Sequence, residues 1–514
     1  MNRREFPAGA SRMTEPVRID GESMSGVDRF PATKGCEPTN GSPDYREWLV
    51  CALVTANLCL LPWAYGGVDV WSQVTSAMLA ACAFGVALLP ERHSAGAGNS
   101  TDRFARWRRL RRFPLFWIGL ALLAYIGLQG LNPRLEYQEN RVAWWLDPIA
   151  HWGWLPSGID APFSKQNGLR FALVWGTCWM AGCAVWVGMR RRSMILGLLT
   201  VLCVNGFLFA AFGLLQRASG AREIYGVRPA FEYFFAAIIY KNHAAAFFSL
   251  VGAVALGLTV RTFQRPRLRV ARSGVTILFS LFTVTIVLAL VLSFSLSVLL
   301  LFGLVIGSAM IGVLRRSKNA ATVTSAKGPV LVGLAVLIGF TIALGGTLAS
   351  AEMQTRIQRL AAGEAGHSLR FRFLAAQRGW EMFMDRPFFG WGAGCFRYGF
   401  TKYQRQEPDL ARWQGFELQW EHVHNDWLEL LIEVGCVGTL FVGLALAYGM
   451  REVVRLRLWR TPAICPMLGG LLALGIQALM DFPLQLPAVA MLASVLLPLL
   501  IRWGELENQK SLVL

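Results

Sequence analysis

Long apolar segments recur along the whole chain, and they constrain its fold more than any other feature of the sequence. A helix needs about 20 apolar residues to cross the hydrocarbon core of a bilayer. The sequence therefore predicts an all-α, polytopic membrane protein with about 12 transmembrane helices. The predicted spans are 48–66, 71–90, 113–130, 169–189, 193–215, 238–259, 274–292, 295–314, 329–349, 426–448, 463–480 and 485–502.

One apolar run is too long for a single span. As one helix, residues 275–314 would extend about 60 Å, roughly twice the thickness of the bilayer core. We expect a break at the polar Ser293-Phe294-Ser295 segment, which leaves two spans of ordinary length.

The charges predict the orientation of these spans. Only 16% of the residues are charged, against about 25% in soluble chains. The 50 Lys and Arg exceed the 32 Asp and Glu, which gives a formal net charge of +18. A basic chain is also typical of nucleic-acid binding. Here, most cations fall in the loops that are cytoplasmic if the N-terminus is inside, as the positive-inside rule requires. We expect cytoplasmic termini, a lipid bilayer around the spans and no nucleic-acid partner.

The spans also predict the domain organisation. The first 47 residues lack an apolar core and are rich in Gly, Pro, Ser and mixed charge, which favours a disordered tail over a signal peptide. The expected parts are a cytoplasmic tail at 1–47, an N-terminal transmembrane bundle at 48–199 with an outer loop at 131–168, a second membrane domain at 200–502 with an outer loop at 350–425, and a cytoplasmic C-terminal tail at 503–514.

Three outer loops are long enough to carry a function: 131–168, 216–237 and 350–425. The first is rich in tryptophan, which suits either an aromatic belt at the membrane interface or a platform on which sugars stack. We favour the belt. The four tryptophans are Trp144, Trp145, Trp152 and Trp154.

The longest outer loop contains an amphipathic segment. Trp380, Phe383 and Met384 follow helical spacing, with Ser368 as a possible N-cap and Pro387 as the end. We expect this helix to be apolar on one face and to lie on the outer membrane boundary. The Gly390-Trp-Gly-Ala-Gly394 segment after it is either an ordinary turn, which we favour, or a close backbone approach to phosphate or sugar.

Two arginines at the start of this helix are candidates for anion binding. Arg370 and Arg372 are two residues apart, about 200° around a helix, so they cannot both point the same way from one regular helix. A solvated charge is the simplest interpretation of either one.

The densest polar signal runs from the loop into the tenth predicted span. His424 and Asn425 precede Asp426, Glu429 and Glu433, three carboxylates on one helix face. Carboxylates inside a span are costly and indicate a function. A helix N-terminus attracts anions, and histidine is the natural general base near neutral pH. The segment predicts chemistry on a phosphorylated lipid.

Two other interpretations of this segment stay open. His422, His424, Asp426 and Glu429 are ligand types that zinc accepts, but their spacing matches no known zinc motif, and the ten cysteines include no CxxC pair. We expect no metal and no cofactor. The second interpretation is structural, with these residues capping the helix and pairing with loop arginines.

Polar residues also occur at the outer ends of two further spans. Lys241, Asn242 and His243 begin the sixth span, and Asp481 follows the eleventh. Lys241 can also simply extend its charge to the interface. Because these residues share one membrane depth with His424 and Glu429, we expect a common cavity that opens outward.

These residues resemble the motifs of a known family. His424-Asn-Asp-Trp-Leu-Glu429, followed by Glu433 and Gly435, is similar to the signature of the O-antigen ligase and polymerase family. Asn242-His243-Ala244, the arginine-led segment from Arg372 to Phe396, and Asp481-Phe482 with Pro487-Ala488 resemble its other motifs in the same order. The resemblance covers roughly 200–500, which makes that region an O-antigen ligase-like membrane domain.

The resemblance implies a glycosyltransferase of the bacterial inner membrane with a periplasmic active site. Its donor would be a glycan on undecaprenyl pyrophosphate, and its acceptor a hydroxyl of a glycan, lipid or protein. His424 would be the catalytic base. Arg372, with Arg370, Lys241 and Arg217, would bind the pyrophosphate. The residues that would orient the site are Asn425, Asp426, Glu429, Glu433, Asn242, His243 and Asp481.

The motifs do not separate a ligase from a polymerase of the same family that extends carrier-linked glycan. A lipid-linked glycan transporter or flippase is a further alternative, because it also needs a polar cavity within the membrane. A transporter, however, has little use for a long outer loop that carries His424, and the sequence shows no internal duplication of its spans.

Overall fold

The computed structural model describes residues 44–90, 104–229, 234–263, 271–319, 366–413 and 416–511, with two isolated positions at 354 and 358. Within these ranges, nine helices are long and apolar enough to cross a membrane, which confirms the all-α polytopic fold. They are α2 (Val70–Leu88), α4 (Pro114–Leu131), α5 (Gly168–Gly188), α6 (Arg192–Ala218), α7 (Lys241–Phe263), α8 (Ala271–Leu292), α9 (Leu296–Asn319), α16 (Asp426–Arg455) and α18 (Pro487–Ser511).

The remaining predicted spans have three different outcomes. The first matches α1 (Tyr45–Trp63), and the eleventh matches α17 (Cys465–Gln477), which is shorter than expected. The ninth predicted span, at 329–349, lies outside the described residues, as do residues 1–43 of the predicted N-terminal tail. The last helix, α18, continues to Ser511, so most of the predicted C-terminal tail at 503–514 is helical.

The predicted break in the long apolar run is confirmed. The first of the two helices, α8, ends at Leu292, and α9 begins at Leu296. Phe294 between them adopts a left-handed backbone with φ 55°, which reverses the chain.

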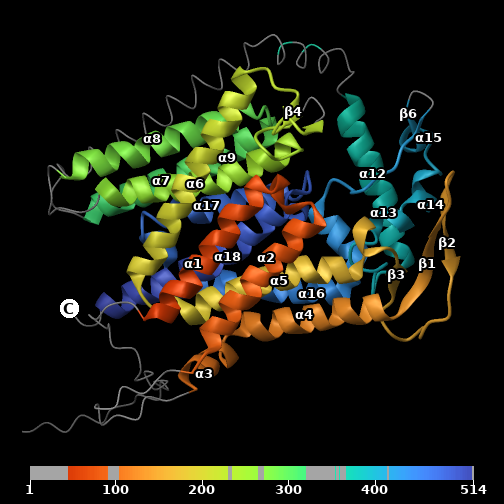
Figure 1. Ribbon diagram of the computed structural model, residues 1–514, viewed down its shortest axis with the longest axis horizontal. Coiled ribbons are helices and arrows are strands. Elements are labelled where there is room, and N and C mark those ends of the chain that lie inside the picture. Colours follow the sequence, from red (N-terminus) through yellow and green to blue (C-terminus); the bar gives the residue numbers. More distant parts are fainter. Residues whose placement is uncertain are drawn as a thin grey trace, which may run out of the picture. The chain divides into compact units, whose positions relative to one another are not determined.

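A single helix, α7, forms the centre of one half of the bundle. Every residue from Asn242 to Val260 is buried. It packs against α6, α8, α9 and α17, and its first turn lies at the outer ends of these helices (Figure 1). In the other half, α5 packs against α2, α4 and α18, and α4 also packs along α16.

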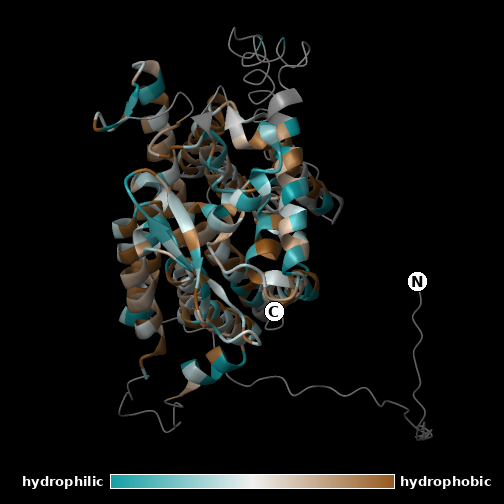
Figure 2. Ribbon diagram, turned by 90° about the vertical axis from the view of Figure 1, so that its right-hand side faces the viewer, coloured by the Kyte–Doolittle hydropathy of each residue, from teal (hydrophilic) through white to brown (hydrophobic). Residues whose placement is uncertain are grey.

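The first outer loop folds into a small sheet. The strands are β1 (Pro133–Glu139), β2 (Trp144–Pro148) and β3 (Gly158–Asp160), in the order β2-β1-β3. Figure 2 faces this end of the bundle and shows the hydrophilic strands in front of apolar helices. Trp144 packs inward on Tyr137, whereas Trp152 and Trp154 are exposed. Of these three tryptophans, the exposed pair is available to a membrane interface or a sugar.

The amphipathic helix of the long outer loop is α12 (Gly366–Asp385), which begins two residues before the predicted cap Ser368. The apolar residues of this helix differ in how far the rest of the protein buries them. Phe383 is buried, whereas Trp380 and Met384 are half exposed. The helix packs on α16 and leads to three short helices, α13 (Phe396–Gly399), α14 (Thr401–Gln404) and α15 (Pro408–Ala411). Its location on the membrane boundary stays a prediction.

The glycine-rich segment after α12 joins a break in α16. Gly435 leaves the helical conformation with φ 64° and ψ −173°, so the helix cannot bond its own backbone there. The loop supplies the partners: Trp391 N donates to Ile432 O at 2.9 Å, and Gly392 N donates to Glu433 O at 2.9 Å. In return, Cys436 N donates to Pro387 O at 2.8 Å. Backbone groups at membrane depth need such partners.

The close approach explains the glycines. A Cβ at Gly390 would lie 2.4 Å from Glu433 O, and a Cβ at Gly435 would lie 2.3 Å from Phe388 O. Two side chains of α4 complete the junction: the Tyr125 hydroxyl lies 2.9 Å from Val434 O, and Gln129 Nε2 donates to Glu433 O at 3.1 Å. The glycine-rich segment is thus a turn that approaches protein backbone.

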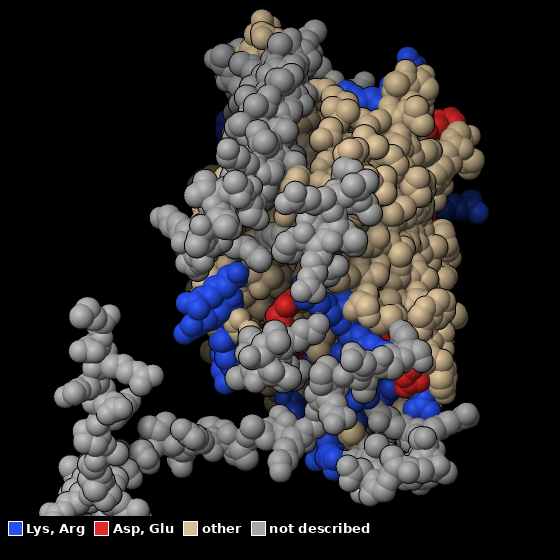
Figure 3. All heavy atoms as spheres, turned by 90° about the vertical axis from the view of Figure 1, so that its left-hand side faces the viewer, with Lys and Arg blue, Asp and Glu red and all other residues tan. Residues whose placement is uncertain are grey.

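The opposite end of the bundle holds buried ion pairs. Both oxygens of Glu47 are bonded: Oε1 accepts from Arg191 N at 2.7 Å, and Oε2 lies 3.5 Å from Arg191 Nε. Glu452 pairs through one oxygen with Arg451 and through the other with Arg455. Figure 3 faces this end and shows Lys and Arg side chains gathered there, with a few carboxylates among them.

Candidate active site

One aromatic side chain organises the outer end of the bundle. The Phe482 ring lies between α16, α17 and the start of α7, and three histidine rings contact it. His422 stacks on it at 4.5 Å between ring centroids, while His243 and His424 meet it edge-on at 4.7 Å and 4.8 Å. Tyr240 stacks on it as well, at 5.5 Å. Three motifs far apart in sequence therefore meet at Phe482.

His424 sits in a constrained turn immediately before α16. Its backbone is left-handed, with φ 60°, a conformation that non-glycine residues rarely adopt. Asn425 follows as the N-cap, and its side chain accepts from Leu428 N at 3.0 Å. The His424 Nδ1 lies 3.6 Å from Asp481 Oδ1 and has no hydrogen-bond partner. A small movement would let Asp481 accept from this nitrogen and orient the ring.

Asp481 joins two of the predicted motifs. The Asn242 amide donates to Asp481 Oδ2, and Phe482 N donates to Asp481 Oδ1 at 3.1 Å. Burial alone would raise the pKa of Asp481, but the nearby His424 ring and the charge of Arg372 outweigh it and hold the pKa below the usual value of 3.8. Asp481 is therefore an anion at neutral pH.

Arg372 and Arg370 diverge, as their spacing predicts. Arg372 reaches the site, where it donates to Met480 O at 3.0 Å and to the Tyr240 hydroxyl at 3.3 Å. Arg370 instead donates to Asp409 at 2.8 Å in an exposed ion pair. Burial raises the pKa of Tyr240 to about 12, so this hydroxyl keeps its proton. Because Tyr240 accepts from Arg372, its own proton is free for another acceptor.

The three carboxylates on α16 serve separate purposes. Asp426 accepts from Leu484 N at 2.9 Å, which ties α16 to the segment after Phe482. Glu429 turns back toward the loop, where its Oε1 lies 2.7 Å from His422 Nδ1. Glu433 accepts from Phe396 N at 3.1 Å and so holds the glycine-rich junction. Their shared helix face does not produce one acidic cluster.

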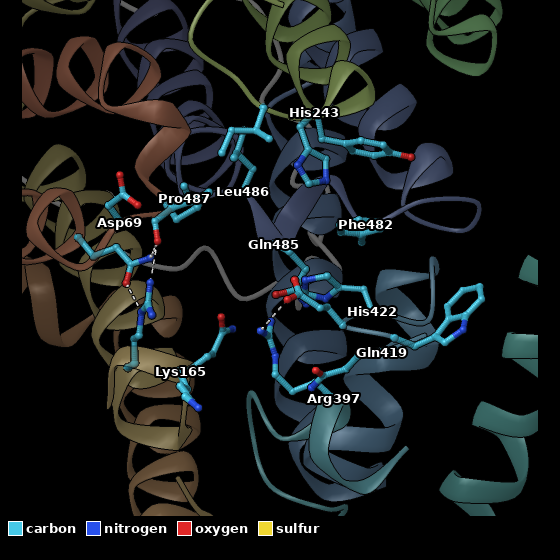
Figure 4. Close-up of a pocket in the computed structure, with 18 of the residues that line it drawn as sticks. Asp69, Lys165, His243, Arg397, Gln419, His422, Phe482, Gln485, Leu486 and Pro487 are labelled. Atoms are coloured by element: carbon cyan, nitrogen blue, oxygen red, sulfur yellow. Dashed lines mark hydrogen bonds and ion pairs between the residues drawn. The ribbon is translucent and has the colours of Figure 1, made fainter. Parts of the chain in front are cut away.

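A cavity of about 980 Å³ opens beside the histidines. Figure 4 shows His243, Phe482 and His422 on one side of it, Asp69 and Lys165 on the other, and Arg397 between them. Its wall comes from five predicted outer segments and the helix ends beside them. Of the residues expected at a common cavity, His243 and His424 line it. Glu429 does not, but it is hydrogen-bonded to His422, which does. The lining residues are Val68, Asp69, Val70, Gln73, Tyr137, Ser164, Lys165, Gln166, Arg170, Arg228, Ile238, Ile239, Tyr240, His243, Arg397, Tyr398, Leu418, Gln419, Trp420, Glu421, His422, His424, Phe482, Gln485, Leu486 and Pro487.

The cations that line the cavity differ from all four of those expected, since Arg370 and Arg372 are not among the lining residues. Neither Arg217 nor Lys241 lines it: Arg217 lies over the Phe294 ring at 4.4 Å, and Lys241 is the first residue of α7.

Sequence reasoning missed the lining cations Arg170, Arg228, Lys165 and Arg397. Arg170 donates to Gln73 and to backbone oxygens, and Arg228 pairs with Asp69. Arg397 has a looser partner, Glu421 at 3.6 Å. All four lie in or beside the long outer loops, and the length of these loops was the one feature of the sequence that pointed to them.

The zinc interpretation finds no support in this geometry. Within the ranges that the structure describes, no group of three or more His, Cys, Asp or Glu side chains is placed to hold a metal ion. His422 is committed to Glu429, and Asp426 accepts from a backbone amide.

Comparison with known proteins agrees with the resemblance in the sequence. A family profile described as O-antigen ligase matches residues 281–443, which include Arg372, the glycine-rich segment and the His424–Gly435 signature. The motifs at Asn242 and Asp481 lie outside the matched range, but the structure places them against His424. No curated protein matches the chain significantly. Residues 281–443 of this multi-pass membrane protein therefore match the O-antigen ligase family, the family of ligase- and polymerase-type glycosyltransferases.

Proposed function

We propose that this protein transfers a glycan from undecaprenyl pyrophosphate to an acceptor hydroxyl, on the periplasmic face of the bacterial inner membrane. The observation that carries the proposal is His424, held beside the Asp481 anion and within a cavity that the outer segments enclose. Both termini would then lie in the cytoplasm, in keeping with the distribution of cations along the sequence.

In this proposal, His424 is the general base. Asp481 accepts from Nδ1 and leaves Nε2 to take the proton of the acceptor hydroxyl. The acceptor oxygen bonds to the anomeric carbon as the bond from that carbon to the pyrophosphate oxygen breaks. The proton ends on His424, and the carrier leaves as a pyrophosphate anion. A single displacement inverts the anomeric carbon.

The pyrophosphate needs cations and hydroxyl donors that stabilise the charge it gains. Arg372 and Tyr240 lie beside the histidines, and Arg397 faces the cavity with only a distant partner. We assign these three to the leaving group, with Lys241 in the first turn of α7 as a further cation. Arg370 and Arg217 have no part in this arrangement, because they contact Asp409 and Phe294.

A reconstituted system tests the proposal. Purified protein in proteoliposomes is given carrier-linked glycan, extracted from a strain that lacks the gene, together with candidate acceptors. We expect release of undecaprenyl pyrophosphate and a product of inverted anomeric configuration, measured by mass spectrometry and NMR. A product with retained anomeric configuration would overturn the single-displacement mechanism. If no acceptor leads to release of undecaprenyl pyrophosphate, the proposed function itself is wrong.

Deletion of the gene separates the ligase from the polymerase. A ligase leaves full-length glycan on the carrier, whereas loss of a polymerase leaves single units still attached to the final acceptor. Glycan trapped on the cytoplasmic face would instead indicate a flippase.

A further inference from the structure

His422 is held in one defined orientation and tautomer. Its Nδ1 lies 2.7 Å from Oε1 of Glu429, and its ring stacks on Phe482 with 21° between the planes. An ionised carboxylate only accepts hydrogen bonds, so Nδ1 carries the proton and donates it to Glu429. In the neutral imidazole, the second ring nitrogen, Nε2, then presents a lone pair.

The Glu429 carboxylate is fixed on all sides. Its side chain is 2% exposed. Oε2 accepts from Val423 N at 3.0 Å, and Oε1 also accepts from the Gln485 amide at 3.2 Å. Each oxygen therefore already accepts from a group that can only donate, Val423 N at Oε2 and the Gln485 amide at Oε1, and this geometry favours His422 Nδ1 as the donor in the remaining bond.

The His422 side chain borders the cavity and keeps one ring nitrogen for a further partner. The ring lines the cavity, and in the described part of the chain its only hydrogen bond is the one to Glu429. His424, in contrast, stands 3.6 Å from its carboxylate. One histidine of the pair is thus set in place before substrate binds, and the other has room to adjust.

We infer that His422 is a substrate-binding residue that accepts a hydrogen bond from a hydroxyl of the glycan, and that Glu429 is the positioning residue that fixes its tautomer. This inference rests on the proposed function and extends it. A lone pair repels phosphate oxygens and attracts hydroxyl donors. The His422 side of the site therefore takes the sugar, and the pyrophosphate lies toward Arg372 and Arg397.

Nitrogen NMR tests the tautomer without reference to activity. The chain has only six histidines, so ¹⁵N-histidine labelling gives a readable spectrum, and the His422→Asn variant identifies the signal. We expect a protonated Nδ1 and a bare Nε2 above neutral pH, and loss of this pattern in Glu429→Gln. A protonated Nε2 in the wild-type protein would refute the inference, even if the enzyme is active.

Kinetics test the role in binding. His422→Asn keeps a donor for Glu429 but removes the acceptor at the Nε2 position. We expect KM for extracted carrier-linked glycan to rise about tenfold, the loss of one buried hydrogen bond, with kcat changed much less. Adding this glycan to the wild-type protein should also shift the His422 Nε2 signal.

The exposed His151, which contacts only its own loop at Ile149 O, provides the matched control His151→Asn. An unchanged KM in His422→Asn, or an unmoved Nε2 signal in an active enzyme, would overturn the binding role. Lack of turnover in the wild-type protein would count against the proposed function instead, and the tautomer would still be measured. If His422→Asn does not fold, single variants at the other five histidines assign the His422 signal by elimination, and the wild-type spectrum still decides the tautomer.

Discussion

The two ends of the helix bundle hold their buried polar groups differently. At the inner end, both oxygens of Glu47 and of Glu452 are bonded to arginines or backbone amides. At the outer end, His424 Nδ1 and His243 Nε2 are buried without a hydrogen-bond partner. Unsatisfied buried groups lower stability and persist where a function needs them. The two carboxylates are thus fully paired, whereas the two histidines keep hydrogen-bonding capacity, which in the proposed function serves a substrate.

The sharpest test of this difference is His424→Ala. A general base contributes about 10²–10⁴-fold to a rate, so we expect transfer to fall by that factor. The melting temperature in detergent should change much less than the rate, because His424 Nδ1 has no hydrogen bond to lose and only ring contacts and the proximity to Asp481 are removed. Wild-type turnover in proteoliposomes would remove His424 from the mechanism.

Gly435→Ala should disrupt the fold rather than the chemistry. The new Cβ would lie 2.3 Å from Phe388 O at a positive φ, which opens the junction between α16 and the loop. We expect loss of folded protein in size-exclusion chromatography. Gly443→Ala on the same helix is the matched control, because no atom lies within 4 Å of its new Cβ. Equal yields from the two variants would contradict the role of the junction.

Arg372→Lys should lower activity at the outer end. Lysine keeps the charge but cannot contact Met480 O and Tyr240 together, so we expect a loss of about tenfold in kcat/KM. Arg370→Lys is the control. Its exposed pair with Asp409 contributes under about 1 kcal/mol, and we expect little change in rate. A larger effect at Arg370 would reverse the assignment of the two arginines.

Glu47→Gln should have the opposite effect to His424→Ala. It weakens hydrogen bonds to two backbone amides and the pair with Arg191, which we expect to lower stability by about 1–3 kcal/mol. Specific activity at moderate temperature should be retained. Melting temperature and turnover, measured on the same preparation, check both expectations. Lost activity with an unchanged melting temperature would contradict a stabilising role for Glu47.

Asp481 gives the smallest expected effect, and it depends on pH. Its pKa is depressed in the folded protein, so its contribution to stability is present above the unfolded value near 4 and is lost as pH falls through the folded pKa. Asp481→Asn should therefore be less stable than wild type at neutral pH, with the gap closing below about pH 4. Melting temperatures between pH 3 and 7 measure this; a constant gap would argue against an ionised Asp481.

Much of the site was predictable from local sequence. The motifs at Asn242, His424 and Asp481 lie at the predicted outer ends of spans, Arg372 lies in the long loop on the same side, and the charge distribution predicts that side. The structure brings all four together. The break at 293–295 was equally predictable, because helix length and bilayer thickness require it.

The rest depends on contacts between distant segments. In the sequence, nothing distinguishes Arg397 from the other arginines of its loop. It lines the cavity because the short helix α13 places it there. Glu433 and Glu429 share a helix face with Asp426, yet their partners come from the loop, so sequence spacing alone suggested a cluster that does not form. The sheet at 133–160 was missed because a loop between spans offers no strong pattern.

The junction at Gly435 has a consequence for how the protein can be divided. Residues 281–443 match the family, but the carbonyl oxygens of Glu433 and Val434 find donors on α4, in the part of the chain assigned to the N-terminal bundle. If the chain were cut near residue 200, the second half would lose the Tyr125 hydroxyl at Val434 O and the Gln129 amide at Glu433 O, and Glu433 O would keep only Gly392 N as a donor from the loop. The segment that matches the family and the N-terminal bundle therefore share one hydrogen-bond network, and a gene fusion, split or transplant of the matched segment should carry α4 with it.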